Sequence, residues 1–123
     1  MPNFLFKKDV EFVHQLFSNF GMSLNKQIFT ENFCVARLIN DSRKVKKYDA
    51  FCAVIGTEQD GRKYINKAIT QGASLVVSEC ETMDNHGKVT VQGDSNTPVL
   101  EFYQLGTRLF EFATQFYCRP QDL

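Results

Sequence analysis

Residues 50–78 read AFCAVIGTEQDGRKYINKAITQGASLVVS, and this stretch decides the fold. The run at 50–55 is continuously apolar, which is typical of a strand buried on both faces. A polar loop with an Asp-Gly turn signal follows at 57–62. Residues 63–71 have helical spacing of their apolar positions, and residues 75–78 form a second short apolar strand. This order predicts a βαβ unit within an α/β fold whose sheet is mixed but mostly parallel, with flanking helices.

Further elements are predicted on both sides of this unit. Towards the amino terminus, Asp9 is a suitable cap for a helix, and the left-handed conformation that Gly21 tolerates would end it. Residues 33–40 are expected to form one strand, and residues 88–92 another. The final stretch is ambiguous, because its helical periodicity begins as early as Pro98. Periodicity alone leaves open a helix from that point or a short strand followed by a helix.

The bulk composition restricts the class of protein. A chain of 123 residues that is 43% hydrophobic can bury the core of one domain. Lys and Arg total 14, as do Asp and Glu, so net charge gives no reason to bind nucleic acid or an anionic membrane. The sequence has neither a signal-peptide pattern nor an apolar run of about 20 residues, so we expect a cytoplasmic protein. Four cysteines without a CxxC pair are expected to be reduced thiols.

Three ordered segments resemble a known family. Asp41-Ser42-Arg43, followed by Val45, Asp49, Phe51 and Ala53, is similar to DSR-x-V-x-x-G-D-x-F-x-A. Gly56, Asp60-Gly61, Tyr64-Ile65, Ala68-Ile69 and Gly72-Ala73 are similar to G-x-x-x-DG-x-x-(F/Y)-I-x-x-A-I-x-x-GA. Phe116-Tyr117 and Pro120 are similar to FY-x-x-P. Together they resemble the amino-terminal domain of the Mur ligases, from about Leu38 onward, and the last segment favours the MurE over the MurF type.

The resemblance implies both a fold and a function. Residues 1–123 are expected to be one amino-terminal UDP-binding domain, in which residues 1–32 form a weakly matched leader helix. The family's pattern also implies a strand at 99–102 before the last helix, which spans 104–117. MurE ligases join diaminopimelate or lysine to UDP-MurNAc-L-Ala-D-Glu with ATP and Mg²⁺. The ATP-binding motif GxxxxGK[ST] does not occur in this sequence. The ATP-binding and carboxyl-terminal domains are therefore expected to be missing, and this piece alone to be inactive.

The resemblance also implies a binding site for the uridine diphosphate end of the substrate, UDP-MurNAc-dipeptide. Its residues lie in two loops that follow predicted strands, where open α/β sheets bind ligands. The expected site residues are Asn40, Ser42, Thr57, Glu58 and Gln59. The Ser42 hydroxyl can donate or accept, and backbone groups of 57–59 can pair with the uracil edge. No residue of this chain is expected to be catalytic, to bind a metal or to hold a cofactor.

One position departs from the family pattern. The family has Gly before the Asp of its G-D step, whereas this chain has Tyr48. A Gly there indicates a turn with positive φ, in which Tyr would be strained, so we expect the turn before Asp49 to differ. Arg43 is expected to pair with Asp49 or with another acid.

The remaining polar residues favour ordinary structural roles. Lys44, Lys46 and Lys47 are expected to form a solvated surface, with some electrostatic help for a diphosphate as the alternative. His14 and His86 lack partners at metal-ligand spacing. The Phe-rich stripes near both termini are expected to be core.

Two other functions compete with the ligase substrate domain. The same domain can serve as a stand-alone, non-catalytic module that binds a UDP-precursor or a protein partner. A nucleic-acid-binding role for residues 44–47 is opposed by the neutral net charge.

Overall fold

The computed structural model describes residues 7–117. Its centre is a five-stranded sheet with the order β3-β4-β5-β7-β6, in which only β6 runs antiparallel to its neighbour. The strands are β3 (Arg37–Ile39), β4 (Asp49–Ala53), β5 (Leu75–Cys80), β6 (Val89–Gln92) and β7 (Thr97–Tyr103). The predicted mixed, mostly parallel α/β sheet is therefore confirmed.

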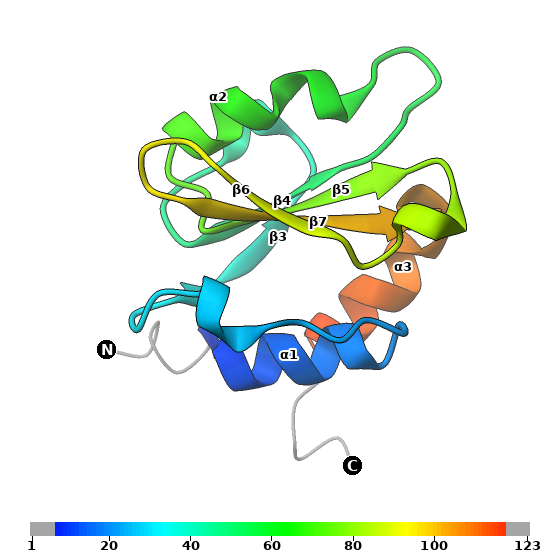
Figure 1. Cartoon of the computed structure of the whole chain (residues 1–123). Coiled ribbons are helices and arrows are strands. Elements are labelled where there is room, and N and C mark those ends of the chain that lie inside the picture. The colour runs from blue at the N-terminus through cyan, green and yellow to red at the C-terminus, as the bar shows by residue number, and fades with distance from the viewer. Residues whose placement is uncertain (1–6, 118–123) are drawn as a thin grey trace.

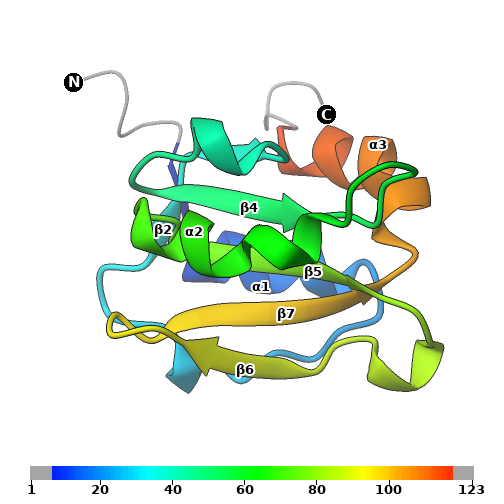
Figure 2. The same cartoon turned by 90° about the horizontal axis from the view of Figure 1, so that it is seen from above.

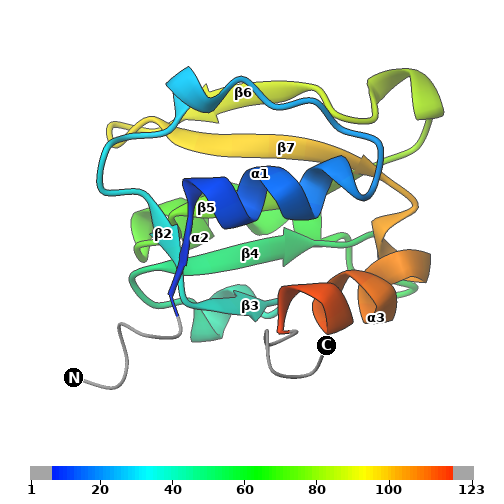
Figure 3. The same cartoon turned by 90° about the horizontal axis from the view of Figure 1, so that it is seen from below.

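Helices cover both faces of this sheet. Helix α2 (Ile65–Thr70) lies on one face, while α1 (Val10–Ser18) and α3 (Leu105–Phe116) lie on the other (Figure 1). Figure 2 shows α2 over the middle of the sheet, and Figure 3 shows α1 and α3 side by side on the opposite face. Short 3₁₀ turns span Lys26–Ile28, Ser42–Lys44, Gly61–Tyr64 and Met83–Asn85.

The interior strand β4 is buried along its whole length, as its apolar sequence predicts. Phe51 and Ala53 pack beneath α2, whereas Ala50 and Cys52 face α1 and α3. The larger core lies on the α1 and α3 side, where Phe17, Phe20, Phe102, Phe112 and Phe116 are buried. Each such side chain contributes about 1.5–3 kcal/mol by leaving water. The Phe-rich stripes are thus core, as expected, with exposed Phe110 as an exception.

The leader helix forms as predicted. Asp9 caps α1 by accepting a hydrogen bond from the Phe12 N–H at 2.9 Å. The helix ends at Ser18, and Gly21 (φ +85°) turns the chain back. The Met22 N–H then donates to the Phe17 carbonyl, which satisfies a group that the helix end leaves free.

The predicted single strand at 33–40 is wrong in one respect, because the structure divides it. Cys34–Val35 (β2) pairs antiparallel with Lys8–Asp9 (β1) in a separate two-stranded sheet, and only β3 joins the main sheet. At the break, the Ala36 N–H donates to the Tyr48 carbonyl at 2.7 Å. The chain therefore changes partner between β2 and β3, and this change depends on a segment far away in sequence.

The ambiguity at the carboxyl-terminal end is resolved in favour of strand then helix. Val99 pairs with Val76 of β5 on one side and with Thr90 of β6 on the other. Helix α3 follows at Leu105–Phe116. The two flanking strands therefore fix residues 97–103 as a strand, although their spacing also suits a helix.

Candidate functional site

A hollow of about 460 Å³ lies beside the carboxyl ends of β3 and β4. It is lined by Asn40, Asp41, Ser42, Arg43, Phe51, Val54, Gln59, Gly61, Tyr64 and Lys67. Three of the five predicted site residues, Asn40, Ser42 and Gln59, thus meet at one place. Thr57 and Glu58 lie at the exposed tip of the second loop and do not line the hollow.

The first loop is a tight turn fixed by its own acid. Asp41 accepts a hydrogen bond from the Arg43 N–H at 3.0 Å and pairs with the Arg43 guanidinium at 2.9 Å. The hydrogen bonds from Arg43 lower the pKa of Asp41 to about 2, so this carboxylate stays ionised at neutral pH. Arg43 therefore pairs with an acid other than Asp49. Asp49 is buried and accepts from the Arg37 guanidinium at 2.7 Å.

Ser42 is the polar residue most enclosed in this loop, at 7% exposure. Its carbonyl accepts a hydrogen bond from Gln71 Nε2 at 2.7 Å. Within residues 7–117 its hydroxyl has no hydrogen-bond partner, and no fully buried polar side-chain atom of that range lacks one. The hydroxyl is therefore not fully buried, and because Ser42 lines the hollow it can bond with a ligand there.

The second loop, residues 56–59, is closed by backbone hydrogen bonds. The Gly56 N–H donates to the Gln59 carbonyl at 3.0 Å, and the Gly61 N–H donates to the Val54 carbonyl at 2.8 Å. A Cβ on Gly56 would lie 2.6 Å from the Gln59 oxygen, and one on Gly61 would lie 2.9 Å from the Val54 oxygen. Both glycines therefore allow the tight loop that the sequence predicts, through close approach of the backbone and not through positive φ.

The loop presents free backbone donors. Among the described residues, the N–H groups of Thr57, Glu58 and Gln59 donate to no protein acceptor. The Gln59 side chain is held by a hydrogen bond from the Tyr64 hydroxyl to its Oε1 at 3.2 Å. The loop therefore offers a row of backbone N–H groups beside one oriented side-chain amide.

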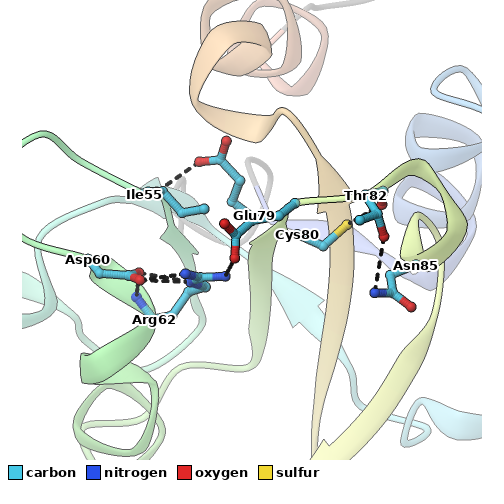
Figure 4. A network of polar contacts seen from close by, with 8 residues as sticks. Ile55, Asp60, Arg62, Glu79, Cys80, Thr82 and Asn85 are labelled. Atoms are coloured by element: carbon cyan, nitrogen blue, oxygen red, sulfur yellow. Dashed lines mark hydrogen bonds and ion pairs between the residues drawn. The ribbon is translucent and has the colours of Figure 1, made fainter.

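Three polar contacts outside the lining lie at this loop, and none was predicted from the sequence (Figure 4). Glu79 on β5 accepts a hydrogen bond from the Ile55 N–H at 2.8 Å. Asp60 pairs with Arg62 at 2.6 Å, and Arg62 also reaches Glu81 at 3.4 Å. Hydrogen bonds from Arg62 lower the pKa of Asp60 to about 2. The only sequence signal for Glu79 is an acid at the end of an apolar strand.

The basic run and the histidines lie elsewhere. Lys44, Lys46 and Lys47 are exposed, as expected for a solvated surface. His86 is bound within the fold, because Nε2 lies 2.7 Å from the Phe20 carbonyl and Nδ1 accepts from the Tyr103 N–H at 2.8 Å. Within residues 7–117 no three His, Cys, Asp or Glu side chains gather as metal ligands.

The turn before Asp49 keeps the conformation that a glycine would adopt, so the expected change of turn is wrong. Tyr48 has φ +74°. Its N–H donates to the Gly72 carbonyl and its carbonyl accepts from Ala36, so both backbone groups are fixed. The Lys7 ammonium lies 3.9 Å from the centre of the Tyr48 ring.

None of the helices within residues 7–117 combines the length and the apolar character that a membrane crossing needs.

Fold and hollow together define an α/β domain with a polar hollow at the carboxyl edge of an open sheet, which is where such sheets usually bind ligands. Comparison with known proteins is more specific. The family described as "Mur ligase family, catalytic domain" matches residues 35–117. The chain belongs to the Mur ligase family.

Several curated relatives are of the MurE type, as the resemblance predicts. The UDP-N-acetylmuramoyl-L-alanyl-D-glutamate–2,6-diaminopimelate ligase of Haemophilus influenzae Rd is 42% identical over 85 residues, which cover 69% of this chain and 17% of that protein. The Vibrio cholerae ligase of the same name is 39% identical over 83 residues, covering 68% of this chain and 16% of the relative. The chain thus spans about a sixth of the length of these relatives.

A solved structure shares the fold. MurF from Acinetobacter baumannii superposes with a TM-score of 0.57 at 13% identity, over 89% of this chain and 21% of that chain.

Proposed function

We propose that this domain binds the uridine diphosphate end of UDP-MurNAc-L-Ala-D-Glu as the substrate-holding part of an ATP-dependent ligase in peptidoglycan synthesis. The observation that carries the proposal is the open Ser42 hydroxyl in a hollow that also holds Asn40 and Gln59. The names of the relatives support the substrate class, because those ligases act on a UDP-linked muramoyl peptide.

The chemistry of the hollow suits a uridine nucleotide. Uracil presents alternating acceptors and donors, which backbone groups of residues 57–59 can match without specific side chains. Thr57 and Glu58 do not line the hollow, so this proposal places the uracil at its rim, against their free N–H groups and not their side chains. Lys67 lines the same hollow and supplies positive charge for a diphosphate, whereas the charge of Arg43 is offset by its pair with Asp41.

The residues of this chain do not fit the Mg²⁺–ATP that the family uses. The sequence contains no GxxxxGK[ST] loop, whose backbone, Lys and hydroxyl would hold the phosphates and the metal. We therefore assign no step of ATP chemistry to these residues. Their part is to bind and orient the nucleotide, and the chain by itself is proposed to be without ligase activity.

An NMR titration of the ¹⁵N-labelled chain with UDP tests the proposal, with ATP as the control ligand. Shifts should concentrate at Ser42 and at residues 57–59. Ser42→Ala should weaken UDP binding by about 0.5–1.5 kcal/mol, the net value of one hydrogen bond, which is about 2- to 12-fold in Kd. Ser23→Ala, at an exposed serine outside the hollow, is the matched control.

Each outcome separates the competing functions. No response to UDP or to UDP-MurNAc-dipeptide would contradict the proposal and favour a protein-binding module. Equal responses to UDP and ATP would indicate general phosphate binding without recognition of uracil. ATP turnover by this chain alone would contradict its assignment as a non-catalytic part.

A further inference from the structure

We infer that Glu79 is a positioning residue, which holds the uracil-facing loop by accepting the Ile55 N–H and owes its own position to Gly106. The inference rests on the proposed function of that loop. Glu79 lies on β5, on the α3 side of the sheet, and does not line the hollow. Its effect on a ligand would therefore be transmitted through the loop.

The loop needs an anchor of this kind. Its two backbone hydrogen bonds, Gly56 N–H to Gln59 and Gly61 N–H to Val54, close the loop upon itself. They do not join its first residue to the neighbouring strand. Ile55 is itself 36% exposed, so its packing restrains the loop only in part. The 2.8 Å hydrogen bond from the Ile55 N–H to Glu79 Oε1 supplies the connection to β5.

The position of the Glu79 carboxylate depends on a residue of α3 that has no side chain, Gly106. Gly106 is the second residue of that helix, and a Cβ built there would lie 3.2 Å from Glu79 Oε1 and 3.7 Å from Oε2. The carboxylate thus lies beside the first turn of α3, where the helix dipole favours negative charge. Figure 4 shows Glu79 reaching from its strand towards this turn and the Ile55 backbone. A methyl group on Gly106 would require Glu79 Oε1 to shift by a few tenths of an ångström.

This arrangement distinguishes positioning from simple stabilisation. Ala favours helix formation over Gly, so Gly106→Ala should leave the melting temperature unchanged or raise it. The same substitution should weaken UDP binding, because displacing Oε1 stretches its hydrogen bond to the Ile55 N–H. A residue with a merely structural role would move stability and affinity in the same direction.

The experiment measures UDP affinity by NMR titration of the whole chain, together with the melting temperature and the Ile55 amide proton shift. Glu79→Met removes the acceptor and should weaken binding about 2- to 12-fold, with an upfield shift of the Ile55 amide proton. Glu79→Gln keeps an acceptor oxygen and should restore most of the affinity. Gly106→Ala should weaken binding about twofold. Glu31→Met, at an exposed acid outside the loop, should change neither affinity nor the Ile55 signal.

The outcomes separate this inference from the function on which it rests. If the unmodified chain does not bind UDP, the proposed function fails and this inference fails with it. The inference alone is overturned if the unmodified chain binds UDP and all three variants, Glu79→Met, Glu79→Gln and Gly106→Ala, bind it with unchanged affinity. Should Glu79→Met fail to fold, an unchanged UDP affinity of folded Gly106→Ala would overturn it.

Discussion

Tyr48 occupies a left-handed backbone conformation that residues other than glycine seldom adopt, and replacing it tests how the chain tolerates the strain of that conformation. Its φ is +74°, and both its N–H and its carbonyl are hydrogen-bonded within the fold. The ring is contacted by two ammonium groups, with Lys7 Nζ at 3.9 Å and Lys47 Nζ at 5.1 Å from its centre. We expect Tyr48→Gly to be more stable than Tyr48→Ala, the reverse of the usual order.

The magnitude follows from what the two variants share. Both lose the ring and its cation–π contacts, which at exposed sites contribute about 0.5–1 kcal/mol each. Only the Ala variant keeps the left-handed strain, which costs about 1–2 kcal/mol. The Gly variant avoids this strain, but its unfolded chain has more conformational freedom, which lowers its free energy of unfolding by about 0.4–1 kcal/mol. The net expectation is that Tyr48→Gly exceeds Tyr48→Ala by about 1 kcal/mol in free energy of unfolding.

Urea unfolding followed by circular dichroism measures this difference, with the original chain as reference. Thermal unfolding should show the Gly variant melting about 3–6 °C above the Ala variant, the shift that about 1 kcal/mol gives in a domain of this size. The control is Lys44, which is exposed and lies outside the described positions with positive φ. There the Gly variant should be less stable than the Ala variant by about 0.5–1 kcal/mol. If Tyr48→Gly is equal to or less stable than Tyr48→Ala, the strain argument is refuted.

Two further predictions concern titration. The Asp60 side-chain carbon signal should titrate with a midpoint near 2, because hydrogen bonds from Arg62 lower its pKa from 3.8. The stability from this pair is therefore fully present above about pH 4 and is lost as pH falls towards 2; a midpoint near 4 in an NMR titration would contradict the pairing. Burial raises the pKa of Cys52 to about 12, so an alkylating reagent at pH 8 should leave Cys52 unmodified until the chain unfolds. Peptide mass spectrometry checks this against the partly exposed Cys34, and early modification of Cys52 would show that β4 is not a closed core strand.

Local signals predict most of the fold correctly. Strand β4 and the helix and strand that follow it can each be predicted from a few adjacent residues. For β4 the signal is an unbroken apolar run, which burial on both faces of the sheet requires. The break between β2 and β3 has no such signal. Cys34 pairs with Asp9, and Ala36 bonds to Tyr48, so the cause lies in segments that sequence spacing alone does not bring together.

The candidate site likewise contains residues that the sequence predicts and residues that only contacts between distant segments identify. Asn40, Ser42 and Gln59 could be proposed from the family resemblance, which agrees with their place after strands whose carboxyl ends meet at one edge of the sheet. Gln71 and Glu79 could not, because they hold the two loops across separations of 29 and 24 residues. Each donates to or accepts from a backbone group, and such a contact leaves no characteristic residue pair in the sequence.

Under the proposed function, this division explains how Thr57 and Glu58 can lie at an exposed tip while their loop takes part in binding. A loop that binds through backbone N–H groups places little demand on its own side chains. It demands instead that the backbone be held in one shape, and Gly56, Gly61 and Glu79 meet that demand. Substitution at Thr57 or Glu58 should therefore be tolerated far better than at these three positions. Recognition of the nucleotide would then depend on residues that do not contact it, which motif comparison within the loop itself does not reveal.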